Sequence, residues 1–160
     1  MNKIPPSERI VSSFKRLASS SDKLNAAAID LGKTISTLDS ALEKLNLGVS
    51  AWHQVAGDDD NGGYWSRDIG YSRVGRKWGI AIKKASGNEN YDHHEEEVWL
   101  FNDAPRWMQV ESVGKLPDLF DDLIERTEET TKKIKAKTTE TQELAVAIEA
   151  VASEVVPKRR

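Results

Sequence analysis

The first third of the chain carries a heptad pattern of apolar residues, which predicts one long helix. Apolar side chains recur at alternating steps of four and three residues, with Ser21 in the one polar slot. This spacing gathers them on a single helix face and is sustained over five repeats. The positions are Ile10, Phe14, Leu17, Leu24, Ala28, Leu31, Ile35, Leu38, Leu42 and Leu45.

The boundaries of this helix are predicted at residues 7–47. Pro5-Pro6-Ser7-Glu8 is typical of a helix start, because proline fits the first turn and Ser7 can cap it. Gly48 is typical of a helix end. At about 1.5 Å per residue, such a helix is roughly 60 Å long. Ser19-Ser20-Ser21 is the one place where it could break, and the regular seam favours an unbroken helix.

Small residues, rather than the Glu and Lys of a simple zipper, flank this seam. One side carries Ser13, Ser20, Ala27, Thr34 and Ala41, and the other includes Ala18 and Gly32. Small flanks widen the buried stripe and let more than one neighbour approach. The sequence therefore favours a helix of a bundle over a two-stranded zipper.

The middle of the chain alternates apolar and polar residues between turn signals, which predicts a β module over residues 50–102. Strands are expected at 50–56, 64–74, 78–86 and 95–102, and Asn61-Gly62 is the strongest hairpin signal. Short connections favour an antiparallel meander of three or four strands. All tryptophans lie between Trp52 and Trp107.

Two more helices are predicted after the β module. A short one is expected at 104–113, starting at Asn102-Asp103-Ala104-Pro105 and ending at Gly114. A second long helix is expected at 116–156, with Pro157 as its end and Lys158-Arg159-Arg160 suiting its negative pole. Its seam again steps by four and three, and it is weakly apolar from Thr127 to Thr141.

The fold class that follows is α+β in a single domain spanning 1–160, with two long helical arms around the β module. The arms have similar lengths and meet the module at one end. If they return antiparallel, residues whose numbers sum to about 163 lie opposite, and Ser21 faces Gln142. We therefore predict an antiparallel, coiled-coil-like hairpin.

Two helices alone cannot bury apolar stripes as wide as these, so part of each stripe would stay exposed to water. A second copy of the chain is expected to bury the remainder in a four-helix bundle. We predict a homodimer or a higher homo-oligomer that associates through the arms. The expected self-association residues are Phe14, Leu17, Leu24, Leu31, Ile35, Leu38, Leu42, Ile134, Leu144 and Ile148.

Composition narrows the function without naming it. The 160 residues have a formal net charge of −3 and no cysteine, which excludes disulfides and thiolate chemistry. No apolar run approaches the roughly 20 residues of a membrane span, and the N-terminus lacks a secretory pattern. We expect a cytoplasmic protein that does not contact a membrane.

Candidate chemistry is sparse. The three histidines are His53, His93 and His94, and the last two follow Asp92 directly. Adjacent residues of a strand point to opposite faces, so His93 and His94 cannot both reach one metal ion from a regular strand. A metal-dependent enzyme using His53, His93 and His94 remains an alternative, whereas a solvated acidic loop is favoured. The Asp58–Gly62 turn departs from the calcium-loop pattern. No catalytic residue and no cofactor are predicted, and an enzyme is not favoured.

Charge segregation is the remaining signal. Basic residues dominate 64–86, and acidic loops flank this stretch on both sides. Together with its aromatics, a basic hairpin could bind nucleic acid, and this is the first alternative. The favoured function is a non-enzymatic protein–protein interaction or assembly module with a possible protein partner. The predicted binding surface is Arg67, Arg73, Arg76, Lys77, Asp92, His93 and His94.

Overall fold

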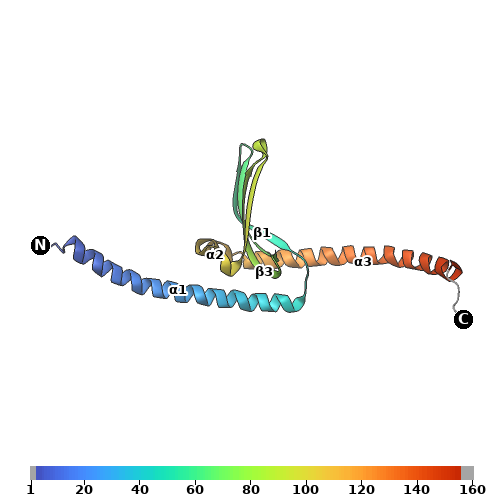
Figure 1. The fold of residues 1–160 in the computed structure, drawn as a ribbon, viewed down its shortest axis with the longest axis horizontal. Helices are drawn as coiled ribbons and strands as arrows, with labels where there is room; N and C mark the ends of the chain where they lie inside the picture. Colours follow the sequence, from blue (N-terminus) through green and yellow to red (C-terminus); the bar gives the residue numbers. More distant parts are fainter. Residues whose placement is uncertain (1–2, 156–160) are drawn as a thin grey trace.

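The computed structural model describes residues 3–155 and shows two long helices that leave a central β body in opposite directions (Figure 1). The helix α1 spans Pro6–Leu45 and α3 spans Leu116–Val155. Between them lie β1 (Ala51–Asp60), β2 (Gly63–Val74), β3 (Lys77–Asn88) and β4 (His93–Leu100). The 3₁₀ turns η1 (Glu89–Tyr91) and η2 (Phe101–Asp103) and the short helix α2 (Arg106–Val113) complete the fold. The α+β class is confirmed.

The helix α1 is unbroken, so Ser19-Ser20-Ser21 do not interrupt it. It begins at Pro6 with Pro5 in the cap position, so Ser7 is not the cap. The chain leaves the helix at Asn46, which has a left-handed backbone, and turns again at Gly48 with φ +62°. The predicted helix end at Val156 and the stop at Pro157 lie outside the described residues.

The sheet is a four-stranded antiparallel meander in the order β1-β2-β3-β4. The strands β1, β2 and β3 are longer than predicted, and Asp58–Asp60 pair with β2 rather than forming a loop. The strand β4 begins and ends two residues earlier than predicted, because Phe101–Asp103 form η2. The first hairpin turns on Asn61 and Gly62 alone, both with positive φ. Such a two-residue turn lets the strands pair up to its edge. The distal half of the sheet, residues 56–66 and 85–97, projects from the helices, and we call it the finger (Figure 1).

The core lies where the proximal half of the sheet meets the two helices. Ile69 pairs with Ile82 and Tyr71 with Ile80, and all four side chains are buried on one face. They pack with a set from the helices and from η2, namely Ile35, Leu42, Phe101, Met108, Leu119 and Leu123. Each long helix therefore contributes only the half that lies beneath the sheet.

The antiparallel hairpin of the two arms is wrong for the single chain. The helices α1 and α3 run in the same direction, and their outer halves leave the body at opposite ends (Figure 1). The two helices run in the same direction because α2 brings the chain back to the side of the body on which the N-terminal part of α1 lies (Figure 1). From there α3 passes beneath the sheet before it leaves on the far side. The two helices meet only near the body, where an apolar groove of about 320 Å³ includes Leu42, Leu45, Phe120 and Ile124.

Candidate self-association and recognition surfaces

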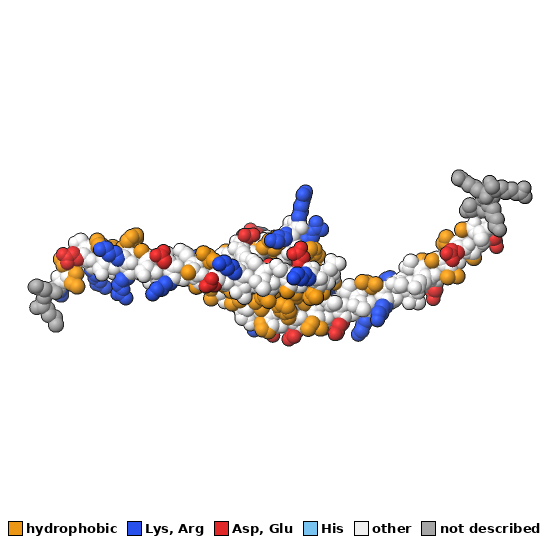
Figure 2. Space-filling model, turned by 90° about the horizontal axis from the view of Figure 1, so that it is seen from below, with side chains coloured by type: hydrophobic (Ala, Val, Ile, Leu, Met, Phe, Trp, Pro, Cys, Tyr) orange, Lys and Arg blue, Asp and Glu red, His pale blue; other side chains and the backbone are white. Residues whose placement is uncertain are grey.

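The outer parts of both long helices contribute no residue to the core of the described chain. Every residue from 6 to 27 and from 131 to 155 is exposed, and we call these segments the N-arm and the C-arm. Figure 2 shows hydrophobic side chains along both arms, outside the central body. Phe14 is 69% exposed and Ile148 is 68% exposed. Large apolar side chains so open to water are typical of an interaction surface.

The predicted self-association residues divide into two groups. Those on the arms are exposed, namely Phe14, Leu17, Leu24, Ile134, Leu144 and Ile148. Those nearer the body are not free: Ile35 and Leu42 are buried in the core, and Leu31 and Leu38 pack against it. The heptad seam of α1 is therefore buried in the chain's own core in the half of the helix near the body, and it is exposed to solvent in the N-arm.

The base of the finger carries a half-buried ion pair between β2 and α2. The guanidinium of Arg67 donates two hydrogen bonds of 2.7 Å to the carboxylate of Glu111. It also lies 4.5 Å from the centre of the Trp65 ring and 5.2 Å from that of Trp107. The hydrogen bonds from Arg67 lower the pKa of Glu111. Arg67 thus fastens α2 to the sheet and is not a free binding residue.

The other basic residues of the predicted binding surface gather at the turn between β2 and β3. Arg73, Arg76 and Lys77 are exposed there, at the end of the sheet opposite to the finger tip. Close by, the Asp39 carboxylate of α1 accepts a 2.7 Å hydrogen bond from the backbone N–H of Ile80. This bond gives the backbone N–H of Ile80 a partner at the point where β3 extends just beyond the end of β4. Burial raises the pKa of Asp39, and the charge of Lys77 partly opposes that shift.

A continuous basic aromatic ribbon does not form. Tyr71 is buried and stacks on Trp78, with ring centres 5.6 Å apart. The ammonium of Lys83 lies 4.3 Å from the centre of the Trp52 ring. Lys83 pairs with Asp68, so it lies on the face opposite to that of Ile69 and Ile82. Tyr71 and Trp78 are therefore engaged in the core, as a small core requires, whereas Trp65 keeps 41% of its surface exposed.

The finger tip is acidic. Asp58, Asp59, Asp60, Glu89 and Asp92 lie around it, and all are exposed. His93 and His94 pair with Asn88 and Gly87 in the same region. The imidazole Nδ1 of His94 contacts the hydroxyl of Tyr64 across Gly87, which has no side chain to intervene. Apart from Arg67, the predicted surface residues therefore fall into two separate groups, one at the tip and one at the β2–β3 turn.

The metal alternative finds no support in the positions of the histidines. His53 lies beside α3, where its Nδ1 is 2.7 Å from the Asp122 carboxylate and its Nε2 is 3.8 Å from Asp118. In the sheet, His53 lies in the row of Trp99, five residues along β4 from His94. At about 3.3 Å per residue, roughly 16 Å separates these rows. Among the described residues, no group of three or more candidate ligands is close enough to hold a metal ion.

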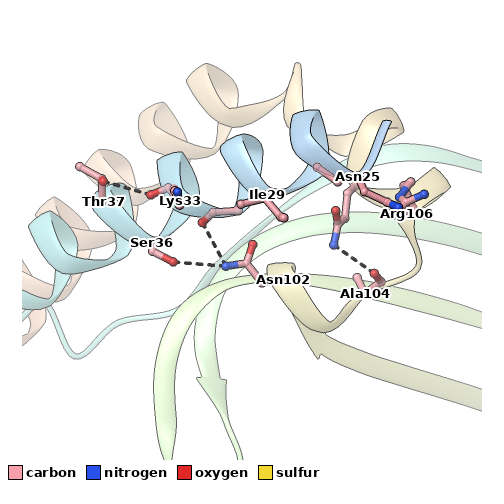
Figure 3. Close-up of a pocket in the computed structure, with 11 residues that line it drawn as sticks. Asn25, Ile29, Lys33, Ser36, Thr37, Asn102, Ala104 and Arg106 are labelled. Carbon is pink, nitrogen blue, oxygen red and sulfur yellow. Dashed lines mark hydrogen bonds between the residues drawn. The ribbon is translucent and has the colours of Figure 1, made fainter. Parts of the chain in front are cut away.

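A groove of about 1010 Å³ lies between α1, η2 and α2 (Figure 3). The Asn102 amide donates to the carbonyl of Gly32 at 3.2 Å and to Ser36 at 3.3 Å. The guanidinium of Arg106 donates to Asn25 at 3.1 Å. Lys33 and Arg106 are the only charged residues among those described that line it, so it lacks an acid–base pair. The sequence analysis missed these bonds, and no local motif marks Asn102 as more than a helix cap.

No helix within residues 3–155 has the length and apolar character needed to cross a membrane. Comparisons with protein-family models, with curated proteins and with solved structures found no match for this chain. The function is therefore argued from the surfaces alone.

Proposed function

We propose that the protein is a self-associating assembly module, whose arms join copies and whose finger presents a recognition surface. The observation that carries this proposal is the exposed seam of the two arms. In proteins, most of the stability of such a helix comes from packing of its apolar face against another surface. A second copy of the same chain supplies such a face for both arms and gives coiled-coil or bundle packing.

The finger suits presentation to a partner because it projects away from the helical layer. Its tip offers exposed acidic groups together with Asp92, His93 and His94, and Tyr91 is 81% exposed there. Such a surface complements a basic protein partner. Self-association through the arms would display several fingers in one assembly, which raises avidity for a repetitive partner.

Light scattering after gel filtration tests the self-association. We expect the wild type to be larger than a monomer at micromolar concentration. The variant Leu17→Asp with Leu144→Asp places one charge in each seam and is expected to be monomeric. The control Ser12→Asp with Gln142→Asp adds the same charges beside the seam and should keep the wild-type mass. A monomeric wild type would contradict the proposal.

Nucleic-acid binding is the second candidate, and it now depends on the exposed basic turn. Arg73, Arg76 and Lys77 form a compact cationic group there. Arg73→Glu would weaken binding to a protein and to a polyanion alike. Only a polyanion would give a steep fall in affinity with salt, because binding releases counterions. A flat salt dependence with several DNA and RNA oligomers would rule this candidate out.

A further inference from the structure

The two free arms match each other in length and direction. The N-arm has 22 residues (6–27) and the C-arm has 25 (131–155), so each extends roughly 33–38 Å. The N-arm runs toward the body and the C-arm runs away from it, at opposite ends of the molecule (Figure 1). We infer that the N-arm of one copy pairs antiparallel with the C-arm of a second copy, and the reverse, across a two-fold axis. This inference rests on the proposed self-association and names the surfaces that meet.

A two-fold axis perpendicular to the helices produces this pairing in one step. Rotation about an axis beneath the body turns the second copy end for end, so each N-arm lies along a C-arm over its whole length. Both arms of both copies are then covered, and the assembly closes as a dimer. Near the axis, the groove between α1 and α3 would also be covered, including Leu45 and Ile124, which are 63% and 57% exposed. The two fingers point away from each other.

The charges at the centres of the arms favour mixed pairing over pairing of like with like. Lys15 and Arg16 lie at the centre of the N-arm, and Glu140 and Glu143 lie at the centre of the C-arm. Antiparallel pairing of an arm with its own copy brings its centre onto itself, so like charges meet. Mixed pairing brings the basic centre of one arm onto the acidic centre of the other. Like charges placed opposite each other suppress the wrong pairing.

The charges also favour the antiparallel direction over a parallel, translated arrangement. The outer C-arm, residues 138–155, has four glutamates and no basic residue, whereas the inner segment 131–137 has four lysines. The N-arm carries four basic residues against two acidic ones, and Arg9, Lys15 and Arg16 lie in its outer part. Antiparallel pairing puts this basic outer part on the acidic outer C-arm. Parallel pairing would put it on the four lysines and would build an open chain of copies.

The apolar seams accept the same arrangement. They coincide when opposing residue numbers sum to 158, which also aligns residue 27 with residue 131 where both arms leave the body. Ile10 then lies opposite Ile148, Phe14 opposite Leu144, and Leu24 opposite Ile134. The small residues that flank the N-arm seam allow the close approach that a bundle needs.

Charge reversal of each arm tests the inference on the full-length chain. Lys15→Glu with Arg16→Glu changes the net charge of the N-arm from +2 to −2. Glu140→Lys with Glu143→Lys reverses the centre of the C-arm. In low salt, each variant alone is expected to raise the dimer dissociation constant by about tenfold or more, and salt should reduce the difference. An equimolar mixture of the two variants should recover wild-type affinity as a heterodimer, because both of its contacts pair opposite charges.

The outcomes separate this inference from the proposed function. A wild type that is monomeric contradicts both. If the wild type associates but the N-arm reversal leaves its affinity unchanged, like arms pair and the mixed arrangement is wrong. A mass that grows past twice that of the chain with concentration overturns the closed dimer. A chain that carries all four substitutions controls for folding, since it should associate like the wild type although it contains every altered residue.

Discussion

At the scale of single residues, one charged side chain of the predicted binding surface fastens two elements of the body together. Arg67 was predicted to be part of a binding surface, and it is the clamp between β2 and α2. Side chains of Arg67 and Glu111 keep only 21% and 28% of their surface exposed. The charge of Arg67 is evident from the sequence, but its partner is not, because that partner lies 44 residues further along the chain.

Glu111→Ala tests this clamp. The substitution leaves a half-buried guanidinium unpaired, so we expect the free energy of unfolding to fall by about 1–2 kcal/mol. Because the pKa of Glu111 is lowered in the folded protein, its contribution is present above the unfolded value of 4.5 and is lost as pH falls through the folded pKa. Urea titrations at pH 7 and pH 3.5 should show a smaller difference at the lower pH. Glu125→Ala, at an exposed glutamate, should have no such effect.

Asp39→Asn tests the carboxylate beneath β3. The pKa of Asp39 is raised above 3.8, so the folded state binds its proton more tightly than the unfolded state does. That stabilising contribution is complete below pH 3.8 and is lost as pH rises through the folded pKa. The amide of the variant keeps an oxygen for the Ile80 N–H without the buried charge. We expect the variant to gain stability relative to the wild type as pH rises from 3.5 to 7, and equal pH dependence of the two proteins would contradict this.

At the scale of elements, local signals in the sequence predicted most of the fold. The unbroken α1, the four strands and the short α2 all follow from periodicity and turn residues. The strand ends were missed because Asp58–Asp60 have the composition of a loop, whereas the Asn61-Gly62 turn extends the ladder through them. Two paired strands can stabilise residues that a strand alone would disfavour.

The direction of the arms could not be predicted because it depends on how α2 returns the chain. Nor does a heptad seam say what covers it: Ile35 and Phe14 occupy equivalent positions, yet Ile35 is 1% exposed and Phe14 is 69% exposed. The predicted residues of the arms and of the finger tip are exposed, as both predicted surfaces require, and their roles stay predictions. The ion pair between Arg67 and Glu111 could not be predicted, because it depends on how α2 packs against the sheet.

Gly70→Ala tests the packing of Trp52 across the outer face of the sheet. A Cβ atom at this position would lie 2.3 Å from the Trp52 ring and 2.7 Å from the carbonyl oxygen of Ala51. Since the backbone atom cannot move aside freely, we expect a loss of about 1–3 kcal/mol in the free energy of unfolding. Gly114→Ala is the matched control, because a Cβ there meets nothing within 4 Å and the backbone is already helical. Thermal melts of the two variants give the comparison.

At the scale of the whole molecule, a small folded body carries two helical arms that contribute nothing to its core. The described core draws on residues from Leu31 to Leu123 and on none from either arm. We therefore expect the body to fold without the arms and the arms to need another surface. This division separates the two tasks of the proposed function, association by the arms and recognition by the finger.

A chain limited to residues 28–130 tests this division. All five tryptophans lie between Trp52 and Trp107, so their fluorescence reports on the body alone. We expect the shortened chain to keep the wild-type emission maximum and a cooperative thermal transition, while light scattering gives a monomer at every concentration. Its melting temperature should not depend on concentration, unlike that of a dimer-forming full-length chain. An unfolded fragment would mean that the arms stabilise the body, and an associating fragment would place the contact between copies on the body instead.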